Sequence, residues 1–125
     1  MKRQYKPDLS VKYAPRVPQR LRKAVNRICI ACDMPEADVL RYSFEAAVLT
    51  APRRLKRSTA SLSAPLDSMM TVRTSRVIGQ RVIDIWRNHP NVLKADILRA
   101  LFDSMLPIAE RRGMAYVMQL REEAL

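Results

Sequence analysis

The stretch Ala37-Asp-Val-Leu-Arg-Tyr-Ser-Phe-Glu45 recurs 58 residues later as Ala95-Asp-Ile-Leu-Arg-Ala-Leu-Phe-Asp103. Five of the nine positions are identical, and the Val/Ile and Glu/Asp differences are conservative. Upstream, an offset of 57 residues pairs Arg16 with Arg73, and one residue inserted in the intervening turn reconciles the two offsets. The pattern indicates two copies of one structural unit in a chain of 125 residues.

Each copy contains the same three elements in the same order: a short extended stretch (residues 11–17 or 69–74) and then two helices. The first helix has an apolar stripe, made by Leu21, Val25, Ile28, Cys29 and Cys32 in one copy and by Ile78, Val82, Ile85 and Trp86 in the other. The second helix has a similar stripe, made by Val39, Leu40, Ser43, Phe44, Ala47 and Val48, and by Ile97, Leu98, Leu101, Phe102, Met105 and Leu106. One such unit cannot bury its apolar faces alone, whereas two can. We therefore expect a mainly α fold with one two-stranded antiparallel β-ribbon.

Alternation within the extended stretches separates two faces. One face holds Lys12, Ala14 and Arg16 in the first copy and Met69, Thr71 and Arg73 in the second. The other face holds Tyr13, Pro15 and Val17, and Met70, Val72 and Thr74. Ser75 is placed to cap the following helix by accepting a backbone N–H.

The chain divides into five segments of one domain. We expect a basic N-terminal arm at 1–10, the first unit at 11–51 and a basic, Ser- and Pro-containing linker at 52–68. The second unit follows at 69–106, and after Pro107 an amphipathic helix occupies 107–125. This C-terminal segment suits internal packing or a partner protein.

The net charge of +11 is concentrated in two segments. Residues 1–27 carry nine basic side chains and one acid, and the run at 53–57 adds four more bases. An anionic partner, above all nucleic acid, is the leading expectation. The residues expected to contact phosphates are Lys2, Arg3, Lys6, Arg53, Arg54, Lys56 and Arg57. For the 53–57 run, plain solvation of a linker is an equal alternative.

Several classes of protein are disfavoured. The chain has only two, widely separated glycines, so no phosphate-cradling loop is present. Its longest uncharged stretches reach about ten residues, too short to span a bilayer. No apolar signal segment follows Met1, so we expect a cytoplasmic location. No arrangement of residues suggests catalysis, so we expect neither an enzyme nor a cofactor.

Cys29 and Cys32 form a C-x-x-C pair that could be half a zinc site or a redox pair. The chain has no other cysteine and one histidine, His89, so small helix residues are the favoured interpretation and we expect no metal. We expect His89 to be structural and Met70 and Trp86 to lie in the core.

Two stretches carry a resemblance to a known family. The junction Arg16-Val-Pro-Gln-Arg-Leu-Arg-Lys-Ala-Val25 resembles the strand-to-helix junction of ribbon-helix-helix proteins, and residues 37–44 resemble their second helix. Members normally dimerise and place a two-stranded ribbon in the DNA major groove. Because both units lie in one chain, the resemblance implies an intramolecular pseudo-dimer that is a monomer in solution. The nearest types are the tandem accessory proteins of conjugative and T-DNA-type plasmid DNA transfer. Val72-Arg-Thr-Ser-Arg76 is similar to the second-half strand of the type that binds a T-DNA enhancer.

The resemblance implies a sequence-selective accessory factor that binds double-stranded DNA and whose target need not be palindromic. The implied base-reading residues are Lys12, Ala14, Arg16, Met69, Thr71 and Arg73. Arg16 and Arg73 are the strongest of these, because a guanidinium can donate twice to guanine. The starts of the second helices, near Glu36 and Lys94, would direct backbone N–H groups at phosphates. Ala14 and Met69 depart from the family, which places polar residues there.

Two other functions stay open. One is a ribbon-helix-helix transcriptional repressor or antitoxin. The other is an RNA-binding protein, although the chain has only seven aromatic side chains for stacking on bases.

Overall fold

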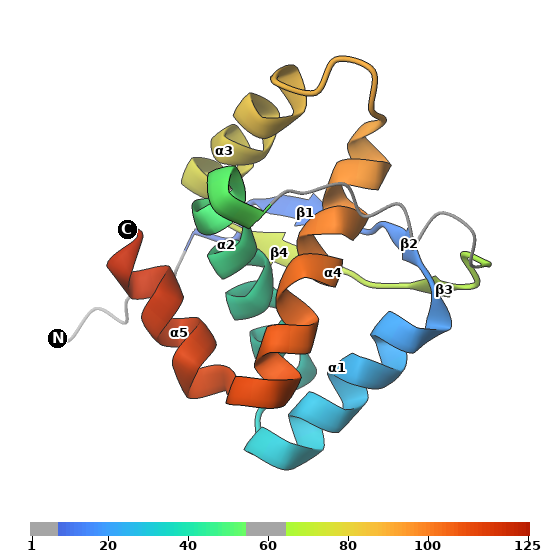
Figure 1. Cartoon of the computed structure of the whole chain (residues 1–125), viewed down its shortest axis with the longest axis vertical. Coiled ribbons are helices and arrows are strands. Elements are labelled where there is room, and N and C mark those ends of the chain that lie inside the picture. The colour runs from blue at the N-terminus through green and yellow to red at the C-terminus, as the bar shows by residue number, and fades with distance from the viewer. Residues whose placement is uncertain (1–7, 55–64) are drawn as a thin grey trace, which may run out of the picture.

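The computed structural model describes residues 8–54 and 65–125. Within these ranges the chain is mainly helical, with five helices and four short strands (Figure 1). The elements are β1 (Val11–Tyr13), β2 (Arg16–Val17), α1 (Gln19–Cys32), α2 (Glu36–Arg54), β3 (Ser68–Met69), β4 (Val72–Thr74), α3 (Arg76–Arg87), α4 (Lys94–Arg112) and α5 (Met114–Glu123). The predicted order of extended stretch, helix and helix therefore occurs twice, and α5 follows the second copy.

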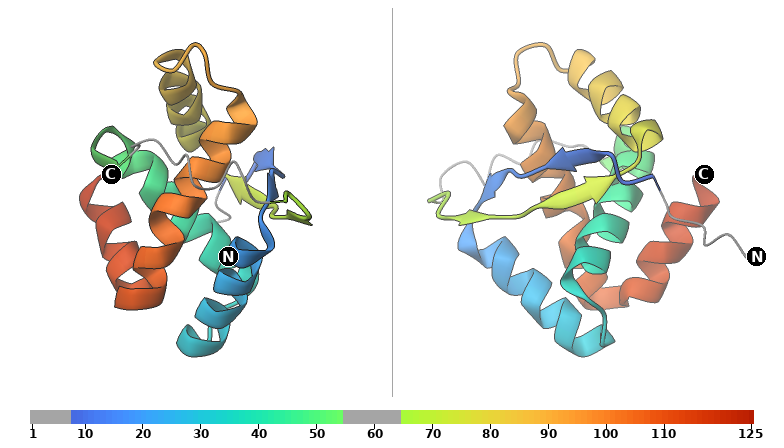
Figure 2. Two further views of the ribbon diagram at one scale, coloured as in Figure 1. Left: turned by 45° about the vertical axis from the view of Figure 1, so that its right-hand side comes forward. Right: turned by 180° about the vertical axis from the view of Figure 1, so that it is seen from behind.

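The strands form a two-stranded antiparallel ribbon in which β1 pairs with β4 and β2 pairs with β3. The register pairs Val11 with Thr74, Lys12 with Arg73, Tyr13 with Val72, Arg16 with Met69 and Val17 with Ser68. Between the two paired segments, the Met70 amide donates to the Pro15 carbonyl at 3.1 Å. Pro15 itself has no N–H to donate, which accounts for the interruption. The ribbon lies across one face of the molecule with the helices behind it (Figure 2).

The core lies where α2 and α4 meet beneath the ribbon. Every residue of the two second-helix stripes is buried, as predicted. At the centre the rings of Phe44 and Phe102 have centroids 5.2 Å apart, and the Tyr13 ring of β1 lies 5.6 Å from that of Phe44. Helix α1 packs mainly on α4, α3 packs mainly on α2, and α5 covers α2 and α4. Each first helix thus packs mainly on the second helix of the other copy.

The helix boundaries differ from the predicted ones at two places. Helix α2 continues to Arg54, three residues beyond the predicted end of the first unit. Helix α4 passes through Pro107 and ends at Arg112, where Gly113 has a φ of 86°. Pro107 is exposed and removes one backbone donor, but Ile108 and Ala109 directly after it are buried, and their packing keeps the helix intact. The break before α5 therefore falls at Gly113.

The end of α3 also differs from the prediction. Trp86 was expected in the core, but it is 41% exposed, and its indole N–H donates to the Val92 carbonyl at 2.9 Å. It lies in the last turn of α3, which together with the start of α4 extends away from the other helices (Figure 1). His89 contacts the Ile85 carbonyl through Nδ1 at 2.8 Å and so helps to end α3.

Other local predictions are confirmed. Met70 is fully buried. The Ser75 hydroxyl accepts a hydrogen bond from the Ile78 amide at 3.3 Å and caps α3. None of the helices within the described ranges combines the length and the apolar character that crossing a membrane requires.

Candidate nucleic-acid interface

The exposed side of the ribbon is the candidate site, and we call it the outer face. Its members are Lys12, Ala14, Arg16, Met69, Thr71 and Arg73, all exposed. The residues between them point into the core and are buried. The predicted separation of the strands into two faces is therefore confirmed. The helices pack against the inner side only, so the outer face is open to solvent (Figure 2).

The register arranges the outer face as three cross-strand pairs. These are Lys12–Arg73 at one end, Ala14–Thr71 in the middle, where the register continues between the paired segments, and Arg16–Met69 at the other end. We call the first the two-cation end and the last the mixed end. The outer face thus differs chemically from one end to the other.

The cations of the outer face are not neutralised by the part of the chain that the structure describes. In that part the side chains of Lys12, Arg16 and Arg73 make no hydrogen bond or ion pair. Some arginines elsewhere do find acidic partners: Arg20 lies 2.9 Å from Asp103, and Arg27 lies 2.8 Å from Glu110. Like charges directly opposite each other in an antiparallel pair are destabilising, so Lys12 facing Arg73 carries a cost in the free protein. An anionic ligand would relieve that cost.

Arg99 holds the mixed end of the ribbon from behind. Its side chain is largely buried on α4, and Nη1 donates to the Arg16 carbonyl at 3.1 Å. It also pairs with Asp96 one turn earlier on the same helix. The backbone that carries the Arg16 side chain is thereby fixed to the core.

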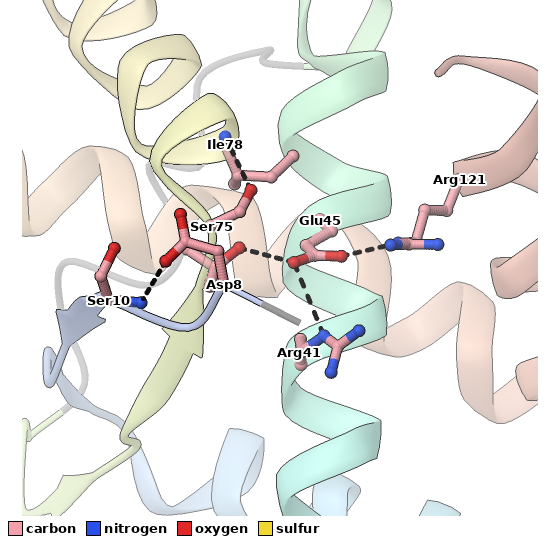
Figure 3. Close-up of polar contacts among 8 residues, drawn as sticks. Asp8, Ser10, Arg41, Glu45, Ser75, Ile78 and Arg121 are labelled. Atoms are coloured by element: carbon pink, nitrogen blue, oxygen red, sulfur yellow. Dashed lines mark hydrogen bonds and ion pairs between the residues drawn. The ribbon is translucent and has the colours of Figure 1, made fainter. Parts of the chain in front are cut away.

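Glu45 holds the two-cation end. Its carboxylate, 3% exposed on α2, accepts a hydrogen bond of 2.6 Å from the Thr74 hydroxyl of β4. The other carboxylate oxygen accepts from Nε of Arg121 on α5, also at 2.6 Å, and Arg41 lies 3.7 Å away (Figure 3). Thr74 directly follows Arg73, so this network connects the strand of a candidate base-reading residue to two helices.

Sequence reasoning did not find Glu45 or Arg99 as supporting residues. The available signal was that both lie inside the duplicated stretch, each as a polar residue beside an apolar stripe. A carboxylate or guanidinium held in such a position needs a partner to offset its desolvation.

The starts of both second helices lie beside the ribbon. A groove of about 270 Å³ separates the start of α2 from β3 and is lined by Arg22, Glu36, Ala37, Leu40, Met69 and Thr71. Glu36 pairs there with Arg22, so the start of α2 carries a carboxylate where a phosphate would bind. Lys94 at the start of α4 is exposed, and its ammonium lies 5.1 Å from the centroid of the Tyr13 ring. Of the two helix starts, the one with Lys94 is better suited to an anion.

The other residues predicted to contact phosphates are only partly covered. Lys2, Arg3, Lys6, Lys56 and Arg57 lie outside the described residues. The backbone of Arg53 and Arg54 belongs to the last turn of α2, and the positions of their side chains are likewise outside the description.

Asp8 and Ser10, which precede β1, connect the two-cation end of the ribbon to α3. The Ser10 amide donates to the Asp8 carboxylate at 3.2 Å (Figure 3). Arg76 of α3 lies 3.9 Å from the same carboxylate. Hydrogen bonding from Ser10, with Arg76 adding to it, lowers the pKa of Asp8. Asp8 therefore stays ionised and offsets part of the charge of Arg76.

The two cysteines lie half-buried on α1, where they pack against the core as free thiols. Burial raises the pKa of the Cys29 thiol, which disfavours the thiolate needed for metal binding or redox chemistry. Among the residues that the structure describes, no three His, Cys, Asp or Glu side chains are grouped so that they could hold a metal ion.

Comparison of the chain with protein-family models, with curated proteins and with solved structures finds no match.

Proposed function

We propose that this protein binds double-stranded DNA by placing the outer face of its ribbon in the major groove. One observation carries the proposal: Lys12, Arg16 and Arg73 project from the exposed face of a two-stranded ribbon without partners in the described part of the chain. The major groove, about 12 Å wide, admits such a ribbon. Arginine and lysine donate to guanine O6 and N7 there, and threonine can contact either a base edge or a thymine methyl group.

We further propose that the chain is two ribbon-helix-helix units fused into an intramolecular pseudo-dimer. The register supports this, because Ala14 and Thr71, which the 57-residue offset makes equivalent, face each other at the centre of the ribbon. Phe44 and Phe102, equivalent at the offset of 58, are also in contact. The packing of each first helix on the second helix of the other copy is what an intertwined dimer requires. A monomer in solution is therefore expected.

The role that we propose is that of an accessory factor in plasmid DNA transfer of the conjugative or T-DNA type. It rests on the similarity of residues 72–76 to the second-half strand of the tandem type that binds a T-DNA enhancer, added to the resemblance of residues 16–25 and 37–44 to ribbon-helix-helix proteins in general. The side chains of the outer face are cations, one hydroxyl and apolar groups. This set supports a role in binding DNA rather than in reacting with it.

Titration of labelled nucleic acids with the full chain tests the proposal. Fluorescence anisotropy should show binding to duplex DNA. The logarithm of the binding constant should fall linearly with the logarithm of the salt concentration, with a slope of about −0.9 for each phosphate that the protein neutralises. Double-stranded and single-stranded RNA of the same sequence should bind more weakly. Footprinting over a plasmid transfer region should then show one protected site, whereas protection only at promoters would assign a repressor role. Preferred binding to RNA, or no binding to duplex DNA, would refute the proposal.

A further inference from the structure

We propose that the outer face reads DNA in one direction only, so that the preferred site is non-palindromic and fixes the orientation of the bound protein. Guanines are expected beneath the two-cation end, and a guanine together with a thymine is expected beneath the mixed end. This inference rests on the proposed function and deepens it by naming the class of sequence that the site selects.

The argument begins with equivalent positions in the two copies. The 57-residue offset relates Lys12 to Met69, Ala14 to Thr71 and Arg16 to Arg73, and only the last pair is conserved in type. A symmetric dimer presents identical side chains to both halves of its site and therefore favours a palindrome. Here two of the three equivalent pairs differ, and the binding surface has lost that symmetry.

The register converts these differences into a direction along the ribbon. Lys12 faces Arg73 at one end, and Arg16 faces Met69 at the other. Lys12 and Met69, which are equivalent positions with different side chains, therefore lie at opposite ends of the ribbon. The four residue-to-residue steps of extended chain from Lys12 to Arg16 span about 13 Å. That distance corresponds to about four base pairs at a rise of 3.4 Å. The two ends therefore contact different base pairs of one short site.

The chemistry of each end names its preferred base pairs. At the two-cation end both side chains are donors, and the acceptors they require, O6 and N7, occur together only on guanine. At the mixed end Arg16 is also a donor and requires the same two acceptors, O6 and N7 of guanine. Met69, 53% exposed and without a strong donor or acceptor, instead suits an apolar contact with a thymine methyl group.

The support behind the ribbon differs between the ends as well. At the mixed end, Arg99 donates to the carbonyl of Arg16. Its counterpart at the offset of 58, Arg41, instead lies beside Glu45, and the two-cation end is held through the Thr74 hydroxyl. Both candidate arginines are thus positioned, but through different contacts, as expected if the two ends have separate targets.

Reversing the protein on its site would exchange Lys12 with Met69. The loss of a good base contact at this position corresponds to roughly a 5- to 150-fold weaker complex. A difference of this size is readily detected by selection from random sequences.

The test is in vitro selection from a random duplex DNA library with two full-length proteins, the wild type and the A14T/M69K variant. The substitutions give both strands the same three outer residues, and both positions are exposed, so the fold should persist. The wild type should enrich a non-palindromic site, and A14T/M69K should enrich an inverted repeat. A matched control, I30K/V77T, introduces the same residue types at exposed positions of α1 and α3 and should enrich the wild-type site.

Three results would overturn the inference. An inverted repeat enriched by the wild type, or the same non-palindromic site enriched by A14T/M69K, would refute directional reading while leaving DNA binding in place. Failure of the wild type to enrich any duplex sequence would instead refute the proposed function, and the inference with it.

Discussion

Simultaneous replacement of Arg16 and Arg73 by alanine should abolish the preference of the protein for its site without unfolding it. Both side chains are exposed and have no partner among the described residues, so the free energy of unfolding should change by no more than about 0.5 kcal/mol for each. Each bidentate contact with guanine contributes about 1–3 kcal/mol of discrimination. Loss of both contacts, about 2–6 kcal/mol together, should reduce the specificity ratio by a factor that lies between roughly 30 and more than 10,000.

The assay is fluorescence anisotropy with two labelled duplexes, the selected site and a scrambled duplex of the same composition, at one fixed salt concentration. The ratio of the two dissociation constants separates base recognition from the general attraction to phosphates. The matched control is R81A/R87A, which removes the same charge from exposed arginines of α3 that likewise have no described partner. The control should weaken binding to both duplexes alike and keep the ratio.

The reasoning would be refuted if R16A/R73A kept the wild-type ratio, because the outer face would then not recognise bases. It would be refuted equally if R81A/R87A lost the ratio to the same extent, since net charge rather than position would then decide. Circular dichroism spectra and melting temperatures of the wild type and the two variants serve as the control for folding, and they should agree among the three proteins.

Further predictions concern the support of the ribbon and the core. Glu45→Ala removes a buried acceptor shared by Thr74 and Arg121 and should cost about 3–5 kcal/mol in urea unfolding; a loss below about 1 kcal/mol would contradict the network. Phe102→Ala should cost about 3–5 kcal/mol in thermal unfolding, because its ring is fully buried against Phe44, and a smaller loss would mean that the site collapses on truncation. The Arg27 guanidinium lowers the pKa of Glu110, so this pair stabilises the fold only while Glu110 is ionised. The difference in Tm between wild type and Arg27→Ala should therefore be present at neutral pH and shrink as the pH falls from the ordinary range of a glutamate, about 4.3, through the lowered pKa of Glu110; an undiminished difference at pH 2 would argue against the ion pair.

The faces of the ribbon and the core of the second helices could be predicted because they depend on short-range periodicity. Alternation of side chains fixes which of Lys12 and Tyr13 points outward once one of them must be buried. Likewise, helical spacing alone places Phe44 and Phe102 on the buried stripes of α2 and α4.

Other features depend on distant partners and could not be predicted. Trp86 continues the apolar stripe of α3, but it is 41% exposed because the last turn of α3 extends away from the other helices (Figure 1). Pro107 would end an isolated helix, yet the burial of Ile108 and Ala109 sustains α4 beyond it. Thr74 and Arg121, which both donate to Glu45, lie 29 and 76 residues away from it on a strand and on a helix, and no local pattern connects them to it.

Methylation interference at guanine N7 tests the central claim most directly, because N7 lies in the major groove where the outer face is proposed to bind. The duplex selected by the wild type is methylated sparsely with dimethyl sulfate, and bound and free fractions are compared. We predict that N7 methylation excludes the duplex from the wild-type complex at guanines beneath both ends of the ribbon. The effect should disappear with R16A/R73A. Equal methylation of bound and free DNA at every guanine would contradict insertion of the ribbon into the major groove.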